Sequence, residues 1–515
     1  MKRPQLVPAG SVDRLMQAAE QAWRQGQLQE SIATLQRAQK LAPGNLQILL
    51  QLGRLHGFAY EYPEAERCYE QALKISPNKT ETLARAGKQS LDFADPSIAR
   101  QYLERAVART DATAEPCVLL AGLYERLHLG DEASALVDKA RAIEPQNPDA
   151  ILARARLDRQ AGQSAKAEEL LKSILQTSAR ETRIRACNEL GALLDREGRY
   201  DEAMSVFLEG KSLQLAEARP LQEQLKRDRL AHEKTFQSLT GDLIQRWYRE
   251  GADQNGPCRY ALLCGHPRSG TTLLEQVLDA HPGVVSLEET PLFRTRAYVP
   301  LRTASPPDAT MLNVLMSATP DSLREARSRY LDAAAKFLGK PIGERLLLDK
   351  NPALNFLIPA FVRILPNAKF LVALRDPRDV CLSCFMQVFV PLGIRNSAYV
   401  RLEDTIDEYC AVMSLWLRIK PLLEGHYLEV RYEEMVENLE NSARQALKTL
   451  GLPWEERVMD FRRGLKGKIV RSPTFADVAK PVSNRAVGRW RKYEKYLQPH
   501  LDRLRPLIKA LGYED

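Results

Sequence analysis

A glycine-containing loop followed by hydroxyl side chains is the clearest candidate for chemistry in this 515-residue sequence. The apolar run Tyr260–Cys264 predicts a buried strand, and LLEQVLDAH, which begins after Thr272, predicts a helix. Between them, GHPRSGTT would turn backbone N–H groups and the positive end of a helix dipole toward an anion. We therefore expect an anion-binding loop rather than a structural turn, with a phosphate as its best ligand.

This loop differs from the Walker A loop of nucleotide kinases. Gly265 and Gly270 have the right spacing, but Thr271 stands where Walker A loops carry a lysine. The cation of the loop is instead Arg268. The missing lysine counts against a nucleotide kinase, which stays open as an alternative.

Two further strand patterns end in charged side chains. The segments Arg345–Leu348 and Phe370–Leu374 each predict a strand followed by a helix, with Lys350 at the first junction and Arg375 at the second. Strands that alternate with helices imply a parallel sheet covered on both faces, which binds ligands at the carboxyl ends of its strands. Arg268, Lys350 and Arg375 would meet there, and their mutual repulsion favours an anion with several charges.

Two C-terminal features extend this candidate site. The segment YLEVRYEEMV repeats the strand–helix pattern, so we add Tyr432, at its junction, to the predicted nucleotide-binding residues. Basic residues far outnumber acidic ones from Phe461 to Lys495, in a chain of formal net charge +8. Such a segment indicates an anionic partner or a solvated basic face. No known nucleic-acid motif accompanies the charge, so we expect no nucleic-acid partner.

The first half of the chain is a repeat array. One phase position recurs as Ala38, Ala72, Ala106 and Ala140, a second as Gly53 and Gly87, and a third as Pro43, Pro77 and Pro145. A fixed period of 34 residues is the signature of the tetratricopeptide repeat, a helix–turn–helix unit. We count six helix pairs between about residue 10 and residue 213. They are expected to stack into a superhelix that binds a peptide or protein, or that holds a homodimer together.

These patterns divide the chain into three parts. Residues 1–219 are the repeat array, residues 220–257 are a bridging segment, and residues 258–515 are the α/β domain. Within the bridging segment, Pro220–Glu250 predicts one charged helix, and Gly251–Pro257 predicts a linker.

The sequence also bears on compartment and metals. No stretch approaches about 18 consecutive apolar residues, and the first residues lack the apolar core of a signal peptide. We therefore expect a cytoplasmic protein without integral membrane contact. Eight scattered cysteines fit a reducing compartment. Cys381 and Cys384 form an isolated CxxC pair, which we expect to pack in a helix interior, and no cluster has metal-ligand spacing.

Three segments together resemble a known enzyme family. PRSGTTLLEQVLDAHP, LRDPRDVCLSCF and KPVSNRAVGRWRKY resemble the sulfotransferases that use 3′-phosphoadenosine-5′-phosphosulfate (PAPS), in the protein-tyrosine sulfotransferase branch. The resemblance covers about residues 256–500, and the first half resembles bacterial fusions of repeats to this domain. It implies a multidomain protein in which an all-α tetratricopeptide superhelix precedes an α/β, P-loop-like, parallel-sheet sulfotransferase domain.

The resemblance also implies roles for individual residues. The 5′-phosphosulfate would be held by Arg268, Ser269, Gly270, Thr271 and Thr272, and the 3′-phosphate by Arg375, Ser383 and Arg489. The catalytic base would be a glutamate of SLEET, where counting from the loop arginine favours Glu289 over Glu288. The catalytic lysine would be Lys350.

Two positions depart from the family pattern. A family serine near the C-terminal loop has no clean counterpart, since Ser472 and Thr474 are near but Phe475 aligns best. A family arginine that follows the phosphate-binding serine is Gln387 here. The first departure puts the hydroxyl's role in doubt, and the second predicts a slightly different grip on the nucleotide.

Sulfuryl transfer is comparable to phosphoryl transfer, so the enzyme mostly positions groups and neutralises charge. Glu289 would take the proton of an acceptor hydroxyl, while Lys350 and Arg268 would stabilise charge on the leaving phosphate. We expect a peptide tyrosine as acceptor, although the missing secretory signal counts against it. A small molecule, a glycan or a lipid stays open, as does a scaffold with an inactive domain. Phe293–Gly339 and Val388–Glu408 are expected to line the acceptor site.

Overall fold

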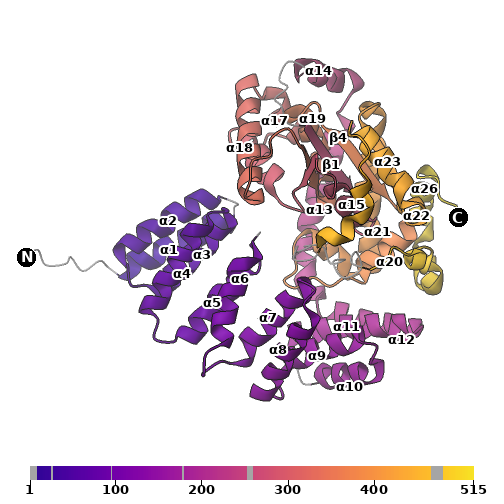
Figure 1. The fold of residues 1–515 in the computed structure, drawn as a ribbon. Helices are drawn as coiled ribbons and strands as arrows, with labels where there is room; N and C mark the ends of the chain where they lie inside the picture. The colour runs from indigo at the N-terminus through magenta and orange to yellow at the C-terminus, as the bar shows by residue number, and fades with distance from the viewer. Residues whose placement is uncertain are drawn as a thin grey trace, which may run out of the picture. The chain divides into compact units, whose positions relative to one another are not determined.

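The computed structural model describes residues 9–24, 27–93, 95–176, 179–251, 259–465 and 480–514. The chain divides into two compact units, Met1–Gly162 and Gln163–Asp515. The first unit is entirely helical in its described residues (Figure 1). Its helices are α1 (Ala9–Arg24), α2 (Leu28–Leu41), α3 (Leu46–Phe58), α4 (Tyr62–Ile75), α5 (Lys79–Ser90), α6 (Pro96–Val107), α7 (Ala114–Arg126), α8 (Gly130–Ile143) and α9 (Pro148–Gln160).

The period of 34 residues has a direct packing cause. The four alanines of the first phase position are 0% exposed, because each lies where two helices pack closely. A Cβ added at Gly53 would lie 2.5 Å from the ring of Tyr69, and one added at Gly87 would lie 2.6 Å from Leu103. The second phase position is therefore glycine because a large side chain of the following helix occupies its space.

This packing predicts the effect of a single methyl group. Tyr69 is fully buried and packs edge-on against Tyr102 at 5.3 Å, so its ring cannot yield to Gly53→Ala. We expect that variant to lose about 1–3 kcal/mol of unfolding free energy, as overpacked cores do. The matched control is Gly122→Ala in α7, where nothing lies within 4 Å, and which should gain about 0.5–1 kcal/mol from helix propensity. Urea unfolding followed by circular dichroism measures both, and equal effects would contradict the packing account.

The second unit begins with helices that continue the repeat pattern. They are α10 (Ser164–Leu175), α11 (Arg180–Arg196) and α12 (Tyr200–Ser212). Twelve helices thus precede residue 213 in the described part of the chain, which is the number that six predicted pairs require. Where one helix was predicted over Pro220–Glu250, the structure has two. α13 (Leu215–Gln237) begins five residues before the predicted segment, and α14 (Gly241–Gly251) follows it. The break falls at Thr240, whose hydroxyl accepts a hydrogen bond from Leu243 N at 3.3 Å, and most of the predicted linker lies outside the described residues.

Five parallel strands form the sheet of the second unit, in the order β2-β3-β1-β4-β5. They are β1 (Arg259–Gly265), β2 (Val284–Ser286), β3 (Leu346–Lys350), β4 (Lys369–Leu374) and β5 (Tyr427–Arg431). Four of them match predicted strands. The edge strand β2 was not predicted, since three residues are too short for a period-2 pattern.

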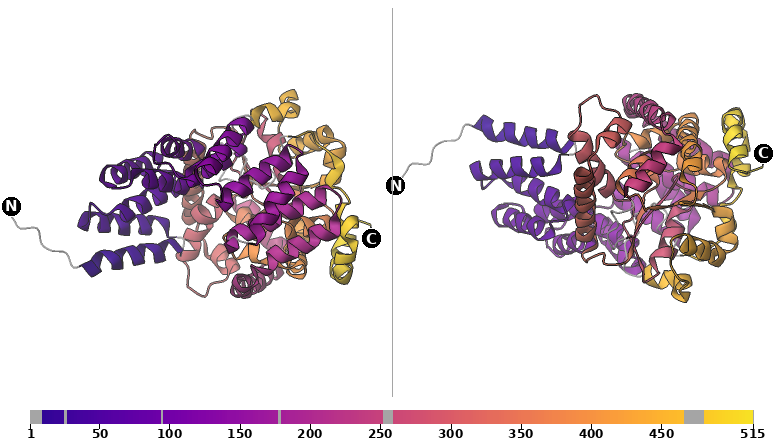
Figure 2. Two further views of the ribbon diagram at one scale, coloured as in Figure 1. Left: turned by 90° about the horizontal axis from the view of Figure 1, so that it is seen from below. Right: turned by 90° about the horizontal axis from the view of Figure 1, so that it is seen from above.

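Helices cover both faces of this sheet, as predicted (Figure 1 and Figure 2). On one face, Leu263 and Leu348 pack with residues of α15 and α23. The alternate residues Leu262 and Leu347 point to the other face and are equally buried. The principal helices are α15 (Thr271–Asp279), α17 (Met311–Ser317), α18 (Pro320–Leu338), α19 (Ile358–Ile364), α20 (Pro377–Phe385), α21 (Leu402–Ile419), α22 (Tyr432–Glu437), α23 (Leu439–Thr449) and α26 (Leu501–Ala510).

The last repeat helices bind the sheet region through buried polar contacts. Lys211 of α12 donates to the backbone oxygens of Tyr399, at 2.8 Å, and Gln387. Asn188 of α11 donates to Met386 O at 2.7 Å. Burial lowers the pKa of Lys211 to about 7. The end of the repeat array is therefore part of the same compact body as the sheet.

Candidate functional site

The carboxyl ends of three neighbouring strands meet at one edge of the sheet. Leu263 of β1 pairs with Lys350 of β3, and Gly265 of β1 pairs with Ala373 of β4. The segment after β1, the residue Lys350 and the segment that starts at Arg375 consequently lie next to one another. This is the edge at which the sequence predicted an anion site.

The loop between β1 and α15 depends on two glycines. Gly265 has φ +125°, and a Cβ there would lie 2.3 Å from the backbone oxygen of Ala373. Gly270 is the N-cap of α15 with φ +91°, and a Cβ there would lie 2.6 Å from the ring of Tyr432. Gly265 N donates to Asn355 Oδ1 at 3.2 Å, and Asn355 Nδ2 donates back to Gly265 O. The loop is thus held closely against β4, Tyr432 and Asn355.

Arg268 lies in this loop with φ +74°, an unfavourable backbone conformation for a residue with a side chain. Its Nε donates to Ser383 Oγ at 3.0 Å, and its backbone oxygen accepts from Arg375 Nη1 at 3.1 Å. Arg268 therefore contacts two residues that were predicted to bind the other end of the same nucleotide. They are Arg375, which follows β4, and Ser383 of α20.

Arg375 is buried against Tyr432, a predicted nucleotide-binding residue, and against Asp379 of α20. Its guanidinium lies 4.8 Å from the ring centroid of Tyr432, and its Nη2 lies 3.6 Å from Asp379 Oδ2. Its Nε is buried, and no described residue accepts a hydrogen bond from it. A buried guanidinium N–H without a protein acceptor fits a site for an anion's oxygen.

Lys350 forms the centre of a buried charge cluster. Its Nζ lies 2.7 Å from Glu289 Oε1 and 3.2 Å from Glu275 Oε2. Burial by itself would lower the pKa of Lys350, but the two carboxylates outweigh it and raise that pKa above its ordinary range. Lys350 is 1% exposed, whereas the side chain of Glu289 is 35% exposed. Glu289 is therefore the member of the cluster that an incoming group can reach.

The short strand β2 positions Glu289. The pairing of β2 with β3 continues beyond Ser286, because Leu287 N donates to Leu348 O at 3.0 Å and Glu289 N donates to Lys350 O at 2.6 Å. Glu288 and Glu289 both have positive φ, at 35° and 38°. Glu288 is 7% exposed. The strained turn at Glu288 and Glu289 thus directs the Glu289 carboxylate toward Lys350.

Sequence reasoning missed Glu275 as a member of this cluster. It lies on α15, fully buried, and accepts a hydrogen bond from Ser286 Oγ as well as pairing with Lys350. The available signal was a carboxylate on the apolar face of the helical pattern LLEQVL. Because a buried carboxylate needs a partner, such a residue indicates a nearby cation.

Asp349 precedes Lys350 on β3 and gives this region a pH dependence. Burial raises the pKa of Asp349 from 3.8 to about 7, against the opposing effect of a 2.8 Å hydrogen bond from the Tyr330 hydroxyl. Between pH 3.8 and about 7, the native state therefore keeps a proton on Asp349 that the unfolded state has released. The stability that this protonation contributes is fully present below the unfolded pKa and is lost as the pH rises through about 7.

We therefore expect Asp349→Asn, which cannot ionise, to gain stability relative to the parent protein as the pH rises from about 4 to 7, by at most roughly 1.4 kcal/mol per pH unit. Urea unfolding at several pH values measures this difference. The control is Asp321→Asn, which removes a carboxylate whose side chain is 86% exposed, measured at the same pH values. A pH-independent effect of Asp349→Asn would show that Asp349 titrates normally.

Arg489 is placed differently from the other predicted phosphate ligands. Its guanidinium pairs with Asp195 of α11, at 3.2 Å from Nε to Oδ1 and 2.9 Å from Nη2 to Oδ2. Its neighbours Gly488 and Trp490 donate their backbone N–H groups to Asp379 on α20. The backbone of this segment thus lies beside Arg375, while the Arg489 side chain is bound by the last repeat pair. Its predicted phosphate contact stays a prediction.

The remaining predicted positions have these places. Ser269, Thr271 and Thr272 are buried in the loop and the first turn of α15. Ser472, Thr474 and Phe475 lie outside the described residues. The CxxC pair packs inside α20, as predicted, and burial raises the pKa of Cys384 to about 12.

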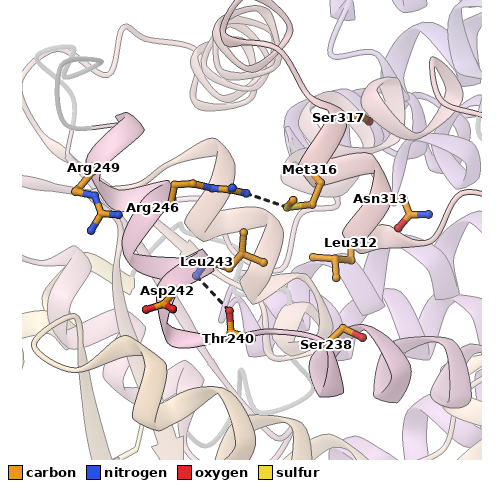
Figure 3. A pocket seen from close by; sticks show the side chains of 10 residues that line it. All are labelled: Ser238, Thr240, Asp242, Leu243, Arg246, Arg249, Leu312, Asn313, Met316 and Ser317. Atoms are coloured by element: carbon orange, nitrogen blue, oxygen red, sulfur yellow. Dashed lines mark hydrogen bonds between the residues drawn. The ribbon is translucent and has the colours of Figure 1, made fainter.

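Two hollows each include a few residues of the regions expected to line the acceptor site. An open groove of about 900 Å³ runs between α14 and α17, where Arg246 Nη2 lies 3.2 Å from Met316 Sδ (Figure 3). A cavity of about 390 Å³ is lined by residues of α13 and α21, together with Phe356 and Arg395. Neither lining includes a predicted catalytic or phosphate-binding residue.

The described ranges contain no group of three or more His, Cys, Asp or Glu side chains placed to hold a metal ion. They also contain no helix with the length and apolar character needed to cross a membrane.

Comparisons with known proteins agree with both halves of this description. Residues 261–456 match the model of the Sulfotransferase family, and residues 130–187 and 184–216 match tetratricopeptide repeat models. Protein-tyrosine sulfotransferase 1 of Danio rerio is 28% identical over 260 residues, which cover 48% of this chain and 71% of that protein. The solved sulfotransferase domain from the Synechococcus PCC 7002 olefin synthase is 20% identical with a TM-score of 0.37, over 50% of this chain and 95% of that one.

A longer match includes the repeats. An uncharacterized protein of Aquifex aeolicus (strain VF5) is 26% identical over 413 residues, which cover 76% of this chain. This chain spans about half of that relative, since the match covers 51% of its length.

Proposed function

We propose that this chain, which carries tetratricopeptide repeats followed by a sulfotransferase-family domain distantly similar to protein-tyrosine sulfotransferases, transfers a sulfuryl group from PAPS to an acceptor hydroxyl. One observation carries the proposal. The buried Lys350, paired with the partly exposed Glu289, lies at the same sheet edge as a loop whose Arg268 contacts both Ser383 and Arg375. This arrangement supports the assignment of a general base, a charge-stabilising lysine and cations for two phosphate groups to one site.

PAPS supplies the sulfuryl group, and the residues of the edge fit it as a ligand. The loop from Arg268 to Thr272 ends at the N-terminus of α15, where backbone N–H groups and the helix dipole favour the 5′-phosphosulfate. The Nε of Arg375 is buried and donates a hydrogen bond to no described residue, so it suits the 3′-phosphate. Ser383 and the ring of Tyr432 complete that side of the site.

Glu289 takes the proton from the acceptor hydroxyl, a role for which its partial exposure suits it. Lys350 then holds positive charge where negative charge grows on the leaving phosphate, helped by Arg268. Glu275 is a positioning residue, because it pairs with Lys350 at 3.2 Å and, together with Glu289, keeps it protonated. Burial of the cluster strengthens these electrostatic effects, since little water screens them.

A peptide tyrosine is the acceptor that we propose. Protein-tyrosine sulfotransferases of several animals match nearly half of this chain, and tetratricopeptide arrays present surfaces suited to polypeptides. Small-molecule, glycan and lipid hydroxyls are the competing acceptors. The cysteines that the structure describes are free, which suits a reaction in the reducing cytoplasm.

The test is transfer from labelled PAPS by the purified full-length chain in a cell extract. Label in protein that is recovered as tyrosine sulfate after digestion would support the proposal. Label only in low-mass material would overturn the protein acceptor but keep the reaction. No transfer to any fraction, together with no calorimetric binding of 3′,5′-diphosphoadenosine, would overturn the reaction itself.

A further inference from the structure

The cavity between α13 and α21 has the features of a small-molecule site. Its volume of about 390 Å³ falls within the range of about 300–1,000 Å³ that ligand pockets usually have. Leu225 of α13, Leu415 of α21 and Phe356 supply apolar walls, and Arg395 supplies a guanidinium. All of these belong to one compact unit.

Arg395 is held in the cavity by stacking rather than by an anion. Its guanidinium carbon lies 4.3 Å from the ring centroid of Phe356, and the ring of His232 lies 4.4 Å from that same Phe356 ring, tilted by 31°. Among the described residues, none forms a hydrogen bond or ion pair with Arg395. Burial lowers the pKa of His232 to about 4, so that ring is neutral near pH 7.

The other charged side chains in the lining have partners of their own. Arg229 pairs with Glu408 at 2.6 Å. Arg418 donates to the backbone oxygen of Phe236 at 3.1 Å.

The two further carboxylates of the lining are partnered as well. Asp228 accepts from Gln224 at 2.8 Å, and Glu233 accepts from Gln237 at 2.9 Å. Glu408 and Asp228 act on Arg395 only at longer range, where Arg294 opposes them. Among the described lining residues, Arg395 is consequently the cation whose guanidinium has no hydrogen-bond or ion-pair partner in the protein, so it can offer its N–H groups to a bound anion.

We propose that this cavity binds a small organic carboxylate with a planar apolar body. A guanidinium recognises a carboxylate through two parallel N–H···O bonds, and it does so best where water is excluded. The apolar body would lie against Phe356, Leu225 and Leu415, where its burial favours binding. The lining contains none of the residues assigned to sulfuryl transfer, so this inference goes beyond the function proposed above.

The cavity also adjoins the phosphate loop. Asn355 lines it, and the same side chain holds Gly265 at the start of that loop. A ligand in the cavity would therefore lie one side chain away from the loop that we assign to PAPS.

Benzoate is the probe, with benzamide as its neutral counterpart, and calorimetry on the full chain is the measurement. We expect saturable benzoate binding at millimolar concentration, with benzamide at least about tenfold weaker. Arg395→Gln should weaken benzoate binding about tenfold or more, because it removes the charge-assisted pair. Arg268→Ala should leave benzoate binding unchanged, since Arg268 belongs to the other anion site.

Several results would overturn the proposal: no saturable benzoate binding, equal binding of benzamide, or binding lost in Arg268→Ala but kept in Arg395→Gln. If Arg395→Gln fails to fold by circular dichroism, Val412→Phe fills the cavity and leaves Arg395 in place. That variant should abolish benzoate binding, and unchanged binding would place benzoate elsewhere. None of these readouts uses enzymatic turnover, so the outcome is independent of the proposed reaction.

Discussion

Glu289→Gln is expected to reduce turnover by roughly 10²–10⁴-fold, because a general base contributes on that order and glutamine cannot accept the proton. The affinity for 3′,5′-diphosphoadenosine should remain nearly unchanged. Glutamine keeps the size of Glu289, and Lys350 keeps Glu275 at 3.2 Å, so the buried lysine retains an anionic partner. Transfer from labelled PAPS measures turnover, and calorimetry measures nucleotide binding.

The matched control for this prediction is the neighbouring Glu288→Gln. We expect it to keep turnover, because the Glu289 carboxylate is the one bonded to Lys350. Full activity of Glu289→Gln together with inactive Glu288→Gln would assign the base to Glu288. Full activity of both variants would remove SLEET from the mechanism altogether.

Arg268→Ala is expected to abolish measurable nucleotide binding. Each charge-assisted hydrogen bond lost is worth about 1.5–3 kcal/mol, which is about 10- to 100-fold in affinity. The loss should exceed one bond, because Arg268 also donates to Ser383 Oγ and its backbone oxygen positions Arg375. Calorimetry with 3′,5′-diphosphoadenosine measures the effect.

Arg324→Ala on α18 is the control for the loss of one arginine, since its side chain is 71% exposed. It should bind the nucleotide like the parent protein. Parent-like binding by Arg268→Ala would mean that the nucleotide binds away from the loop after β1. Thermal unfolding of both variants separates a binding defect from a folding defect.

Several features of this protein could be predicted from local sequence patterns. The alanines that recur from Ala38 to Ala140 predicted the helical repeats, because every repeat needs a small buried residue at the same position. The strand–loop–helix pattern around Gly265 and Gly270 predicted the loop between β1 and α15, because the glycines permit conformations that other residues resist. Lys350 and Arg375 were predicted to share one edge because parallel strands end together.

Only the tertiary structure decided which side chains meet. Glu275 pairs with Lys350, and Asp195 of the last repeat pair binds Arg489, although each pair is far apart in the sequence. The cavity around Arg395 depends on α13 packing against α21. Periodicity reports which face of an element is buried, and turn residues report where it ends. Neither reports which distant partner a buried charge acquires, because that depends on how all the elements pack together.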